Sequence, residues 1–324
     1  MPEPEDKDKR KKEEKRRHHY TPVLYLKNFT DAAGLLHAIY LPAGNRSQST
    51  PEALGFENDL YRPDFEDLDP NAYEDIFAEF EGEAAPIIRE VVDNRSIPVD
   101  DEKQDMLYNF IAFQAVRLPS TKTAIAKPIL HTWRVIESML ANSKPLYERY
   151  AKEAGIDLTE HTHEKFKAGL GKYKMKITTD AFVEYAMHRM DVMLPYISAR
   201  NWSVLYSDRP GEQFLISDRP VVLRWADGRP PNFYGPGHGQ MKTDLTIPLS
   251  QKVMLIGRFE DGLTNGEASR EQVATLNGRT ISGAQRFVGA SSDDFIVEGP
   301  NGIIDAAGYI ELVKADAKAP SEGN

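Results

Sequence analysis

The spacing of apolar residues changes from a helical to a strand period near Trp202, and this change limits the folds open to the chain. Before it, apolar residues recur three and four positions apart, which is typical of amphipathic helices. These helices are expected at residues 71–92, 101–117, 120–150 (with breaks at Pro128 and Pro145) and 179–199. Beyond it, short apolar runs between turn residues predict strands. The predicted strands are Trp202–Tyr206, Gln213–Ser217, Val221–Trp225, Asp244–Leu249, Val253–Phe259, Arg286–Ala290 and Tyr309–Val313.

Helices followed by strands predict an α+β fold. We expect a central helical layer at residues 70–200, packed on a mostly antiparallel C-terminal sheet at residues 202–313. One helix, at residues 269–284, is expected among the strands. Because helices and strands do not alternate regularly, neither a Rossmann fold nor a β/α barrel is expected.

The region ahead of the helices is more irregular. Residues 18–29 predict an extended apolar entry, since Thr21 precedes a proline and is therefore disfavoured in a helix. Residues 35–41 predict a strand. Residues 42–70 are rich in Pro, Gly, Asn and Asp and predict a loop.

Charged and polar ends flank the expected folded region. Residues 1–17 contain eight basic and six acidic residues and little that could be buried. We expect a disordered tail at residues 1–17, a single domain at 18–315 and a second disordered tail at 316–324. The first tail either contacts nucleic acid or another anionic surface, or is merely solvated; its interleaved acids and the net charge of −10 argue against nucleic acid.

The composition excludes several kinds of chemistry. Without cysteine, the chain has no disulfide, thiolate nucleophile, iron–sulfur cluster or cysteine-bound zinc, and a reducing cytoplasmic setting is expected. No apolar run approaches the roughly 18 residues that span a bilayer, so no membrane association is expected. The glycine-rich run Gly235–Gly239 follows no strand, and His161 and His163 lie in a polar connection, so neither predicts a cofactor site.

Several polar residues lie at positions where the pattern predicts burial, and burial of a polar group is costly unless it is paired or used. Gln114, Arg117 and Asn277 fall on the inward faces of their predicted helices, and Glu81 lies at the edge of such a face. Asp218 lies between two strands that are expected to be buried.

The sequence His-His-Tyr-x-Pro-x-x-Tyr-Leu-x-x-Phe at residues 18–29 resembles the opening signature of the bacterial family called domain of unknown function 4238. Gln114-x-x-Arg117, Ser217-Asp218-x-Pro220 and the helix that carries Asn277 are also similar to that family. The resemblance covers about residues 18–315 and implies one domain in a bacterial cytosol, but no activity. Arg219 departs from the family pattern, which has asparagine there.

The first functional hypothesis is a metal-assisted hydrolase that acts on a phosphodiester or another anionic substrate. His19, Asp218 and Glu81 would be catalytic, and His18, His19 and Asp218 would hold zinc or manganese. The residues expected to bind substrate are Arg117, Gln114 and Asn277.

Two other interpretations stay open. The same residues could form a non-enzymatic binding or sensing module for a small anionic ligand or a partner. They could also be purely structural: Glu81 and Arg117 as a buried ion pair, Asp218 as a turn residue, and the two amides as partners of backbone groups. The sequence predicts neither the substrate nor the oligomeric state.

Overall fold

A computed structural model describes residues 14–65, 67–173, 175–229 and 235–318. The helices are α1 (Val23–Leu26), α2 (Ala72–Asn94), α3 (Asp101–Val116), α4 (Pro119–Asn142), α5 (Lys144–Glu153), α6 (His163–Gly169), α7 (Thr179–Ser198), α8 (Arg270–Gly283) and α9 (Ala306–Lys318), with short 3₁₀ turns η1 (Lys27–Phe29) and η2 (Pro51–Ala53). The strands are β1 (Arg17–His19), β2 (Leu36–Tyr40), β3 (Asn45–Ser49), β4 (Phe56–Asn58), β5 (Asn201–Tyr206), β6 (Ile216–Ser217), β7 (Val222–Trp225), β8 (Thr243–Ser250), β9 (Val253–Arg258), β10 (Gly266–Glu267), β11 (Phe287–Ala290), β12 (Ile296–Gly299) and β13 (Gly302–Asp305).

The strands form two larger sheets and two hairpin-like pairs. The first has the order β10-β5-β9-β8-β7 and is antiparallel except for the β10–β5 pair. The second has the order β3-β2-β11-β6 and is antiparallel throughout. Strand β1 pairs with β4, and β12 pairs with β13. The predicted α+β class and the mostly antiparallel pairing are confirmed.

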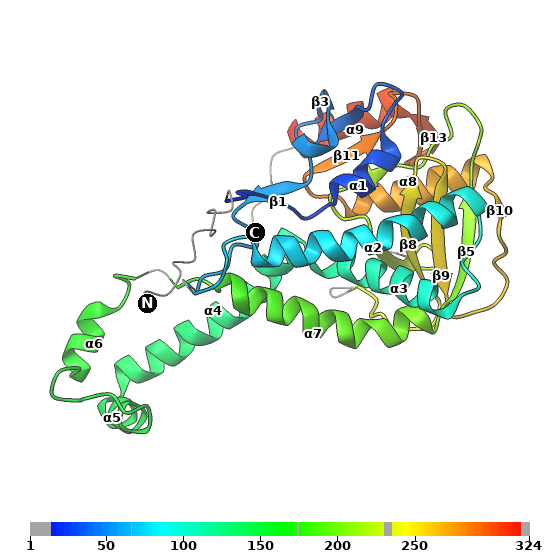
Figure 1. Cartoon of the computed structure of the whole chain (residues 1–324). Coiled ribbons are helices and arrows are strands. Elements are labelled where there is room, and N and C mark those ends of the chain that lie inside the picture. Colours follow the sequence, from blue (N-terminus) through cyan, green and yellow to red (C-terminus); the bar gives the residue numbers. More distant parts are fainter. Residues whose placement is uncertain (1–13, 66, 174, 230–234, 319–324) are drawn as a thin grey trace, which may run out of the picture.

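The five-stranded sheet is covered on both faces. Successive side chains of a strand point to opposite faces, and β9 shows this directly. Leu255 packs in the cluster that contains Phe110 of α3 and Phe182 of α7, whereas Met254 packs with Val273 of α8. In Figure 1, α2, α3 and α7 lie together beside this sheet, and the segment from α4 to α6 extends away from it.

Some helix ends follow directly from the sequence. The Asp100 side chain accepts a hydrogen bond from the Lys103 N–H at the start of α3, and Ser269 forms a capping box with Gln272 at the start of α8. Pro145 lies in the first turn of α5, where its missing N–H costs nothing, so the predicted break there is confirmed. Pro128 lies inside α4 without ending it.

Other predictions were wrong. Tyr309–Val313 belongs to helix α9, because Tyr309, Ile310 and Val313 also share one helical face against the second sheet. Val23–Leu26 is helical, since the restriction that Pro22 imposes falls on Thr21, outside the helix. The predicted loop at 42–70 supplies β3 and β4. The predicted strand at 35–41 is present as β2, but the sheets are not confined to the C-terminal region, because β2 and β3 pair beside β11.

The ends of the chain are only partly described. Residues 1–13 and 319–324, which the sequence assigns to disordered tails, lie outside the described residues. Lys15 and Arg16 contact the folded part through Asp75 and Asp59, and α9 continues to Lys318. The single domain at residues 18–315 stays a prediction. In the described part of the chain, no helix is both long and apolar enough to cross a membrane.

The side chain of Asn277 links α8 to two neighbouring segments by hydrogen bonds. Its Oδ1 accepts from the Leu215 N–H at 3.0 Å, and its Nδ2 donates to the carbonyls of Gln213 (2.9 Å) and Ile296 (2.8 Å). The side chain is fully buried. Its hydrogen-bonding capacity is therefore used within the fold, as the structural interpretation of this residue requires.

We expect Asn277→Ala to lower the free energy of unfolding by about 3 kcal/mol, because three buried backbone groups lose their partner. Urea unfolding followed by circular dichroism would measure this. Asn142→Ala, at the exposed end of α4, is the control and should change stability by less than about 0.5 kcal/mol. Equal stability of the two variants would contradict this role.

Candidate functional site

The two histidines of the opening signature have different surroundings. His18 is fully buried, its Nε2 bonds to the Lys15 carbonyl at 2.8 Å, and its Nδ1 accepts from the Tyr61 N–H at 2.8 Å. Because a carbonyl can only accept, Nε2 must carry the proton and Nδ1 the lone pair. This arrangement requires the neutral ring, and burial lowers the pKa of His18 in agreement. Neither nitrogen is left to bind a metal.

His19 lies beside a buried ion pair. Its ring contacts the Glu52 carbonyl at 3.3 Å, and its own carbonyl accepts from Arg117 Nη2. Arg117 also pairs with Glu81 and is only 2% exposed, while the Tyr61 hydroxyl donates to the Arg117 carbonyl. The structure thus brings together His19, Glu81 and Arg117, and the predicted ion pair is present.

Burial acts to lower the pKa of Arg117, but Glu81 and, after it, Tyr61 together outweigh burial, and the pKa lies above its ordinary value. The guanidinium also lies against aromatic rings, with its central carbon 4.4 Å from the Phe113 ring centroid and 5.4 Å from that of Phe77. Neither of the two described cavities includes Arg117, Glu81 or His19 among its lining residues. Their arrangement is that of a structural core rather than an open site.

Glu74 is a second carboxyl near this ion pair. Burial raises its pKa from 4.5 to about 7, and the neighbouring Glu81 acts in the same direction. Its Oε1 is buried and has no hydrogen-bond partner among the described residues. Glu74 is therefore held in the fold more easily as a neutral acid than as a carboxylate.

The remaining predicted residues lie apart from this cluster. Asp218 Oδ1 accepts from the N–H groups of Gln285 (2.9 Å) and Arg286 (3.0 Å) and more weakly from that of Phe287 (3.4 Å). Asp218 therefore joins the connection before β7 to the backbone that leads into β11, whereas the expected turn role has the carboxylate bonding its own local backbone. Gln114 faces inward as expected and is fully buried, but neither side-chain polar atom has a partner among the described residues.

These placements do not assemble the predicted metal site. Within the described ranges, no group of three or more His, Asp or Glu side chains is close enough to hold a metal ion. His18, His19 and Asp218 are each engaged in separate contacts with backbone groups. The structure therefore does not support zinc or manganese bound by these three residues.

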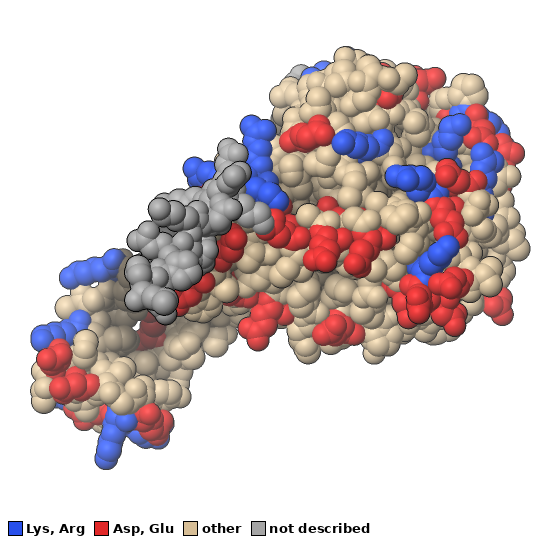
Figure 2. All heavy atoms as spheres, in the orientation of Figure 1, with Lys and Arg blue, Asp and Glu red and all other residues tan. Residues whose placement is uncertain are grey.

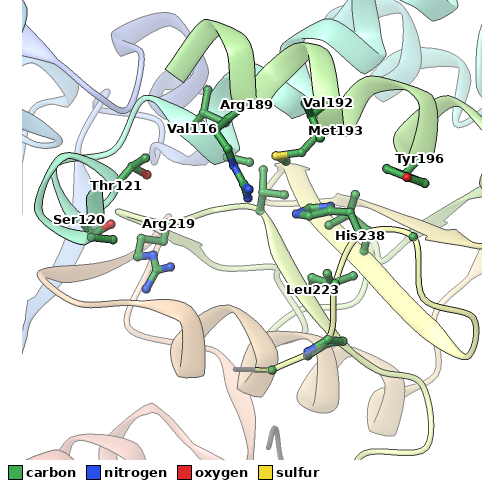
Figure 3. A pocket seen from close by; sticks show the side chains of 18 of the residues that line it. Val116, Ser120, Thr121, Arg189, Val192, Met193, Tyr196, Arg219, Leu223 and His238 are labelled. Carbon is green, nitrogen blue, oxygen red and sulfur yellow. The ribbon is translucent and has the colours of Figure 1, made fainter. Parts of the chain in front are cut away.

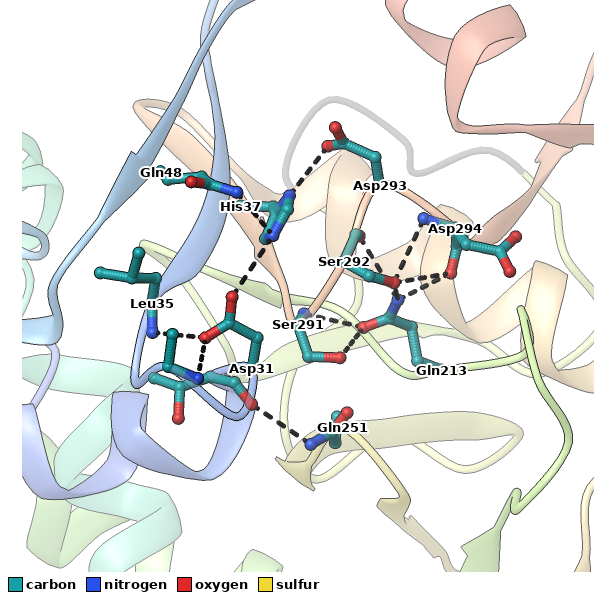
Figure 4. A network of polar contacts seen from close by, with 12 residues as sticks. Asp31, Leu35, His37, Gln48, Gln213, Gln251, Ser291, Ser292, Asp293 and Asp294 are labelled. Carbon is teal, nitrogen blue, oxygen red and sulfur yellow. Dashed lines mark hydrogen bonds and ion pairs between the residues drawn. The ribbon is translucent and has the colours of Figure 1, made fainter.

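Another polar cluster surrounds His37 on β2 (Figure 4). His37 Nδ1 lies 3.3 Å from Asp293 Oδ1, and its Nε2 lies 3.7 Å from Asp31 Oδ2. Asp31 also accepts from the Leu35 N–H, which lowers the pKa of its carboxyl. Gln213 binds Ser291 and neighbouring backbone groups. The cluster connects β2 to the loop after β11 and adjoins neither described cavity.

The larger of those cavities has a volume of about 1070 Å³ and lies where α4, α7 and the loop before β8 meet. This is at the upper end of the range for small-molecule sites, about 300–1,000 Å³. Arg189 of α7, Arg219 and His238 bring basic groups to it, and no Asp or Glu is among its described lining residues. Figure 3 shows Arg189 extending from α7 into the cavity and Arg219 lying beside Ser120.

The guanidinium groups of these two arginines are unpaired among the described residues. Neither guanidinium forms a hydrogen bond or ion pair with another described residue, whereas the buried Arg117 and Arg200 are both hydrogen-bonded. Arg219 lies near Arg224, where burial and then the charge of Arg219 lower the pKa of Arg224. A cavity with unpaired cations and no acid among its described lining residues favours an anionic ligand.

The first turn of α4 adds to the positive electrostatic potential in the large cavity. Ser120 and Thr121 line the cavity, and the N-cap residue of α4 is Leu118, whose side chain cannot accept a hydrogen bond. The N-terminal end of a helix carries a partial positive charge that favours anions. The helix dipole therefore acts together with Arg219.

His238 contributes a neutral polar group. Burial, followed by the charges of Arg200 and Arg189, lowers its pKa to about 4, so the ring is neutral near pH 7. Its Nδ1 is buried and has no partner among the described residues. Its carbonyl accepts from Arg200 Nη2 at 2.8 Å, which fixes this loop against the start of β8.

The residues of the cavity were not predicted as a site. Arg189 and Arg219 come from a helix face and a strand connection, and nothing in their spacing joins them. One signal could have been followed: the glycine-rich run Gly235–Gly239, which does not fit a dinucleotide loop, lines the cavity.

The fold and cavity define an α+β protein with a cationic pocket between its helical layer and its main sheet. The chain belongs to the family described as "Protein of unknown function (DUF4238)", whose model matches residues 17–294. No curated protein and no solved structure matches it.

We expect the raised pKa of Glu74 to appear in the pH dependence of stability. Because the folded pKa of about 7 exceeds the ordinary 4.5, the fold binds this proton more tightly, and stability falls as the pH rises from 4.5 through 7. Glu74→Gln should therefore stabilise the protein at pH 8 by up to about 3 kcal/mol, with no gain at pH 4.5.

Urea unfolding at the two pH values tests this. The control is Glu79→Gln, because Glu79 is exposed on the same helix. Its free energy of unfolding should equal that of wild type at both pH values. A gain for Glu74→Gln that does not depend on pH would contradict the assignment.

Proposed function

We propose that this protein is a binding module for a small anionic ligand, which it takes up in the cavity beside Arg189 and Arg219. The observation that carries the proposal is the pair of unpaired guanidinium groups in a cavity without described acidic lining. Guanidinium groups bind phosphate and carboxylate in a planar, bidentate manner, and such charge-assisted bonds are among the strongest in proteins.

The surroundings of the cavity support a selective site rather than a generally basic surface. The chain carries a net charge of −10, and Figure 2 shows acidic side chains gathered over the face where α2 lies. An anion is therefore repelled by much of the molecule and attracted at the cavity. This distribution also argues against a long nucleic acid as the partner, since such a polymer would contact the acidic exterior too.

The hydrolase hypothesis has less support. It needs His18, His19 and Asp218 around one metal ion, and these side chains have separate partners. The large cavity contains a neutral histidine but no described carboxylate that could activate water. Binding without chemistry is therefore the function that the geometry favours, and a cytoplasmic location stays a proposal.

We expect Arg219→Ala and Arg189→Ala each to weaken the binding of inorganic phosphate at least about tenfold. Loss of one charge-assisted hydrogen bond removes about 1.5–3 kcal/mol, and about 1.4 kcal/mol is tenfold in Kd. Isothermal titration calorimetry at about 0.15 M ionic strength, where the Debye length is about 8 Å, would measure the affinities.

Arg134→Ala is the matched control, because Arg134 is an exposed cation on α4 that lines neither cavity. Its affinity should stay within about twofold of wild type, since a distant exposed charge is largely screened. Absence of phosphate binding to wild type, or an equal loss in all three variants, would overturn the proposal.

A further inference from the structure

A second, smaller cavity adjoins the first. Its volume is about 320 Å³, and it shares Ser120, Ala124, Arg219 and Gln285 with the large cavity. Arg219 thus lies in the wall common to both. The two cavities therefore meet at these shared residues.

The small cavity has cations of its own. Lys127 of α4 lines it but not the large cavity, and it has no ion pair or hydrogen bond with another described residue. Arg286 also lines it, but it is paired with Glu57 at 2.7 Å. Asp218 is the one acid among its described lining residues, and its Oδ1 is occupied by backbone N–H groups. Among the described residues that line one cavity only, Lys127 is therefore the unpaired cation of the small cavity and Arg189 that of the large one, while the unpaired Arg219 lines both.

The large cavity also has an apolar and aromatic side. Met193, Val192 and Leu223 line it, together with the half-exposed rings of Tyr185 and Tyr196. Figure 3 shows Met193, Val192 and Tyr196 along α7, on the same side of the cavity as Arg189. Such a wall accommodates a flat, weakly polar group, for which an aromatic ring offers a stacking face.

We propose that the ligand is a small molecule with two separate phosphoryl groups on an aromatic body, of the nucleoside bisphosphate class. One phosphoryl group binds beside Arg189 and Arg219 in the large cavity, and the second binds beside Lys127 in the small one. Arg219 contacts both, and the aromatic body lies against Met193 and Tyr196. The inference rests on the proposed anion-binding function and extends it from one anionic group to two.

The two cavities together predict how much affinity the second phosphoryl group adds. Once the first phosphoryl group is bound, the second is held near the small cavity. Its contacts there add affinity without a second loss of translational freedom. The gain must depend on Lys127 and not on positive charge elsewhere on α4. The pair Lys127 and Arg134 makes this testable, because both are exposed, unpaired cations on one helix and only Lys127 lines a cavity.

The experiment compares adenosine 3′,5′-bisphosphate with adenosine 5′-monophosphate and adenosine 3′-monophosphate by calorimetry on the full chain. Wild type is expected to bind the bisphosphate at least about tenfold more tightly than either monophosphate. Lys127→Ala should abolish this preference and leave the better monophosphate within about twofold of wild type. Arg134→Ala should retain the preference, and Arg189→Ala should weaken every ligand.

The outcomes separate this inference from the proposed function. If the monophosphates bind and the bisphosphate binds no more tightly, the two-chamber ligand is wrong and the anion site stands. If Lys127→Ala and Arg134→Ala reduce the preference equally, the gain is general electrostatics, and the inference is again overturned. If none of the three nucleotides and no inorganic phosphate binds, both proposals fail. Circular dichroism of each variant excludes loss of the fold as the cause.

Discussion

The buried Arg117 holds together the part of the molecule on which the cavity depends. Its guanidinium binds Glu81 of α2 and the backbone of β1, and its own carbonyl accepts from Tyr61. Removing one partner of a buried ion pair costs about 3–5 kcal/mol, because the other charge is left uncompensated. Arg117 follows directly after α3 and precedes α4 by two residues. Fixing it therefore also fixes where α4 begins.

The position of the start of α4 decides the electrostatics of the cavity. Its first turn contributes Ser120 and Thr121, and Lys127 lies two turns further along the same helix. Arg189 and Arg219 approach from α7 and from the connection before β7. Most other arginines near the core are satisfied, as Arg258 and Arg279 are by Asp244. The contrast between these paired cations and the unpaired ones in the cavity is the basis of the functional account.

The sequence predicts the fold better than the site, for physical reasons. A helix or strand is set by periodicity over ten or so residues, so α3, α7 and α8 were predicted within a few residues. The same periodicity placed Gln114, Arg117 and Asn277 inside, and all three are buried. Burial alone could not distinguish a catalytic role from a structural one. Asn277 proves to join backbone groups, and Arg117 proves to pair with Glu81.

The cavity could not be predicted because it is made by tertiary packing. Arg189 resembles any exposed cation of an amphipathic helix, and Arg219 resembles an ordinary turn residue. Their role depends on the absence of an ion-pair partner among the described residues, which no local pattern reveals. Tyr309–Val313 illustrates the same limit at the level of the fold, since five residues fit a strand and a helix equally well.

The most direct test of the central claim is a crystal structure of the full chain grown or soaked with tungstate, located by its anomalous scattering. Tungstate is a heavy analogue of phosphate, so its position reports the anion site without any assumption about the natural ligand. The account predicts a tungstate ion in the large cavity, within hydrogen-bond distance of Arg219 and the first turn of α4. A cavity without tungstate, with the ion bound only elsewhere on the surface, would contradict it.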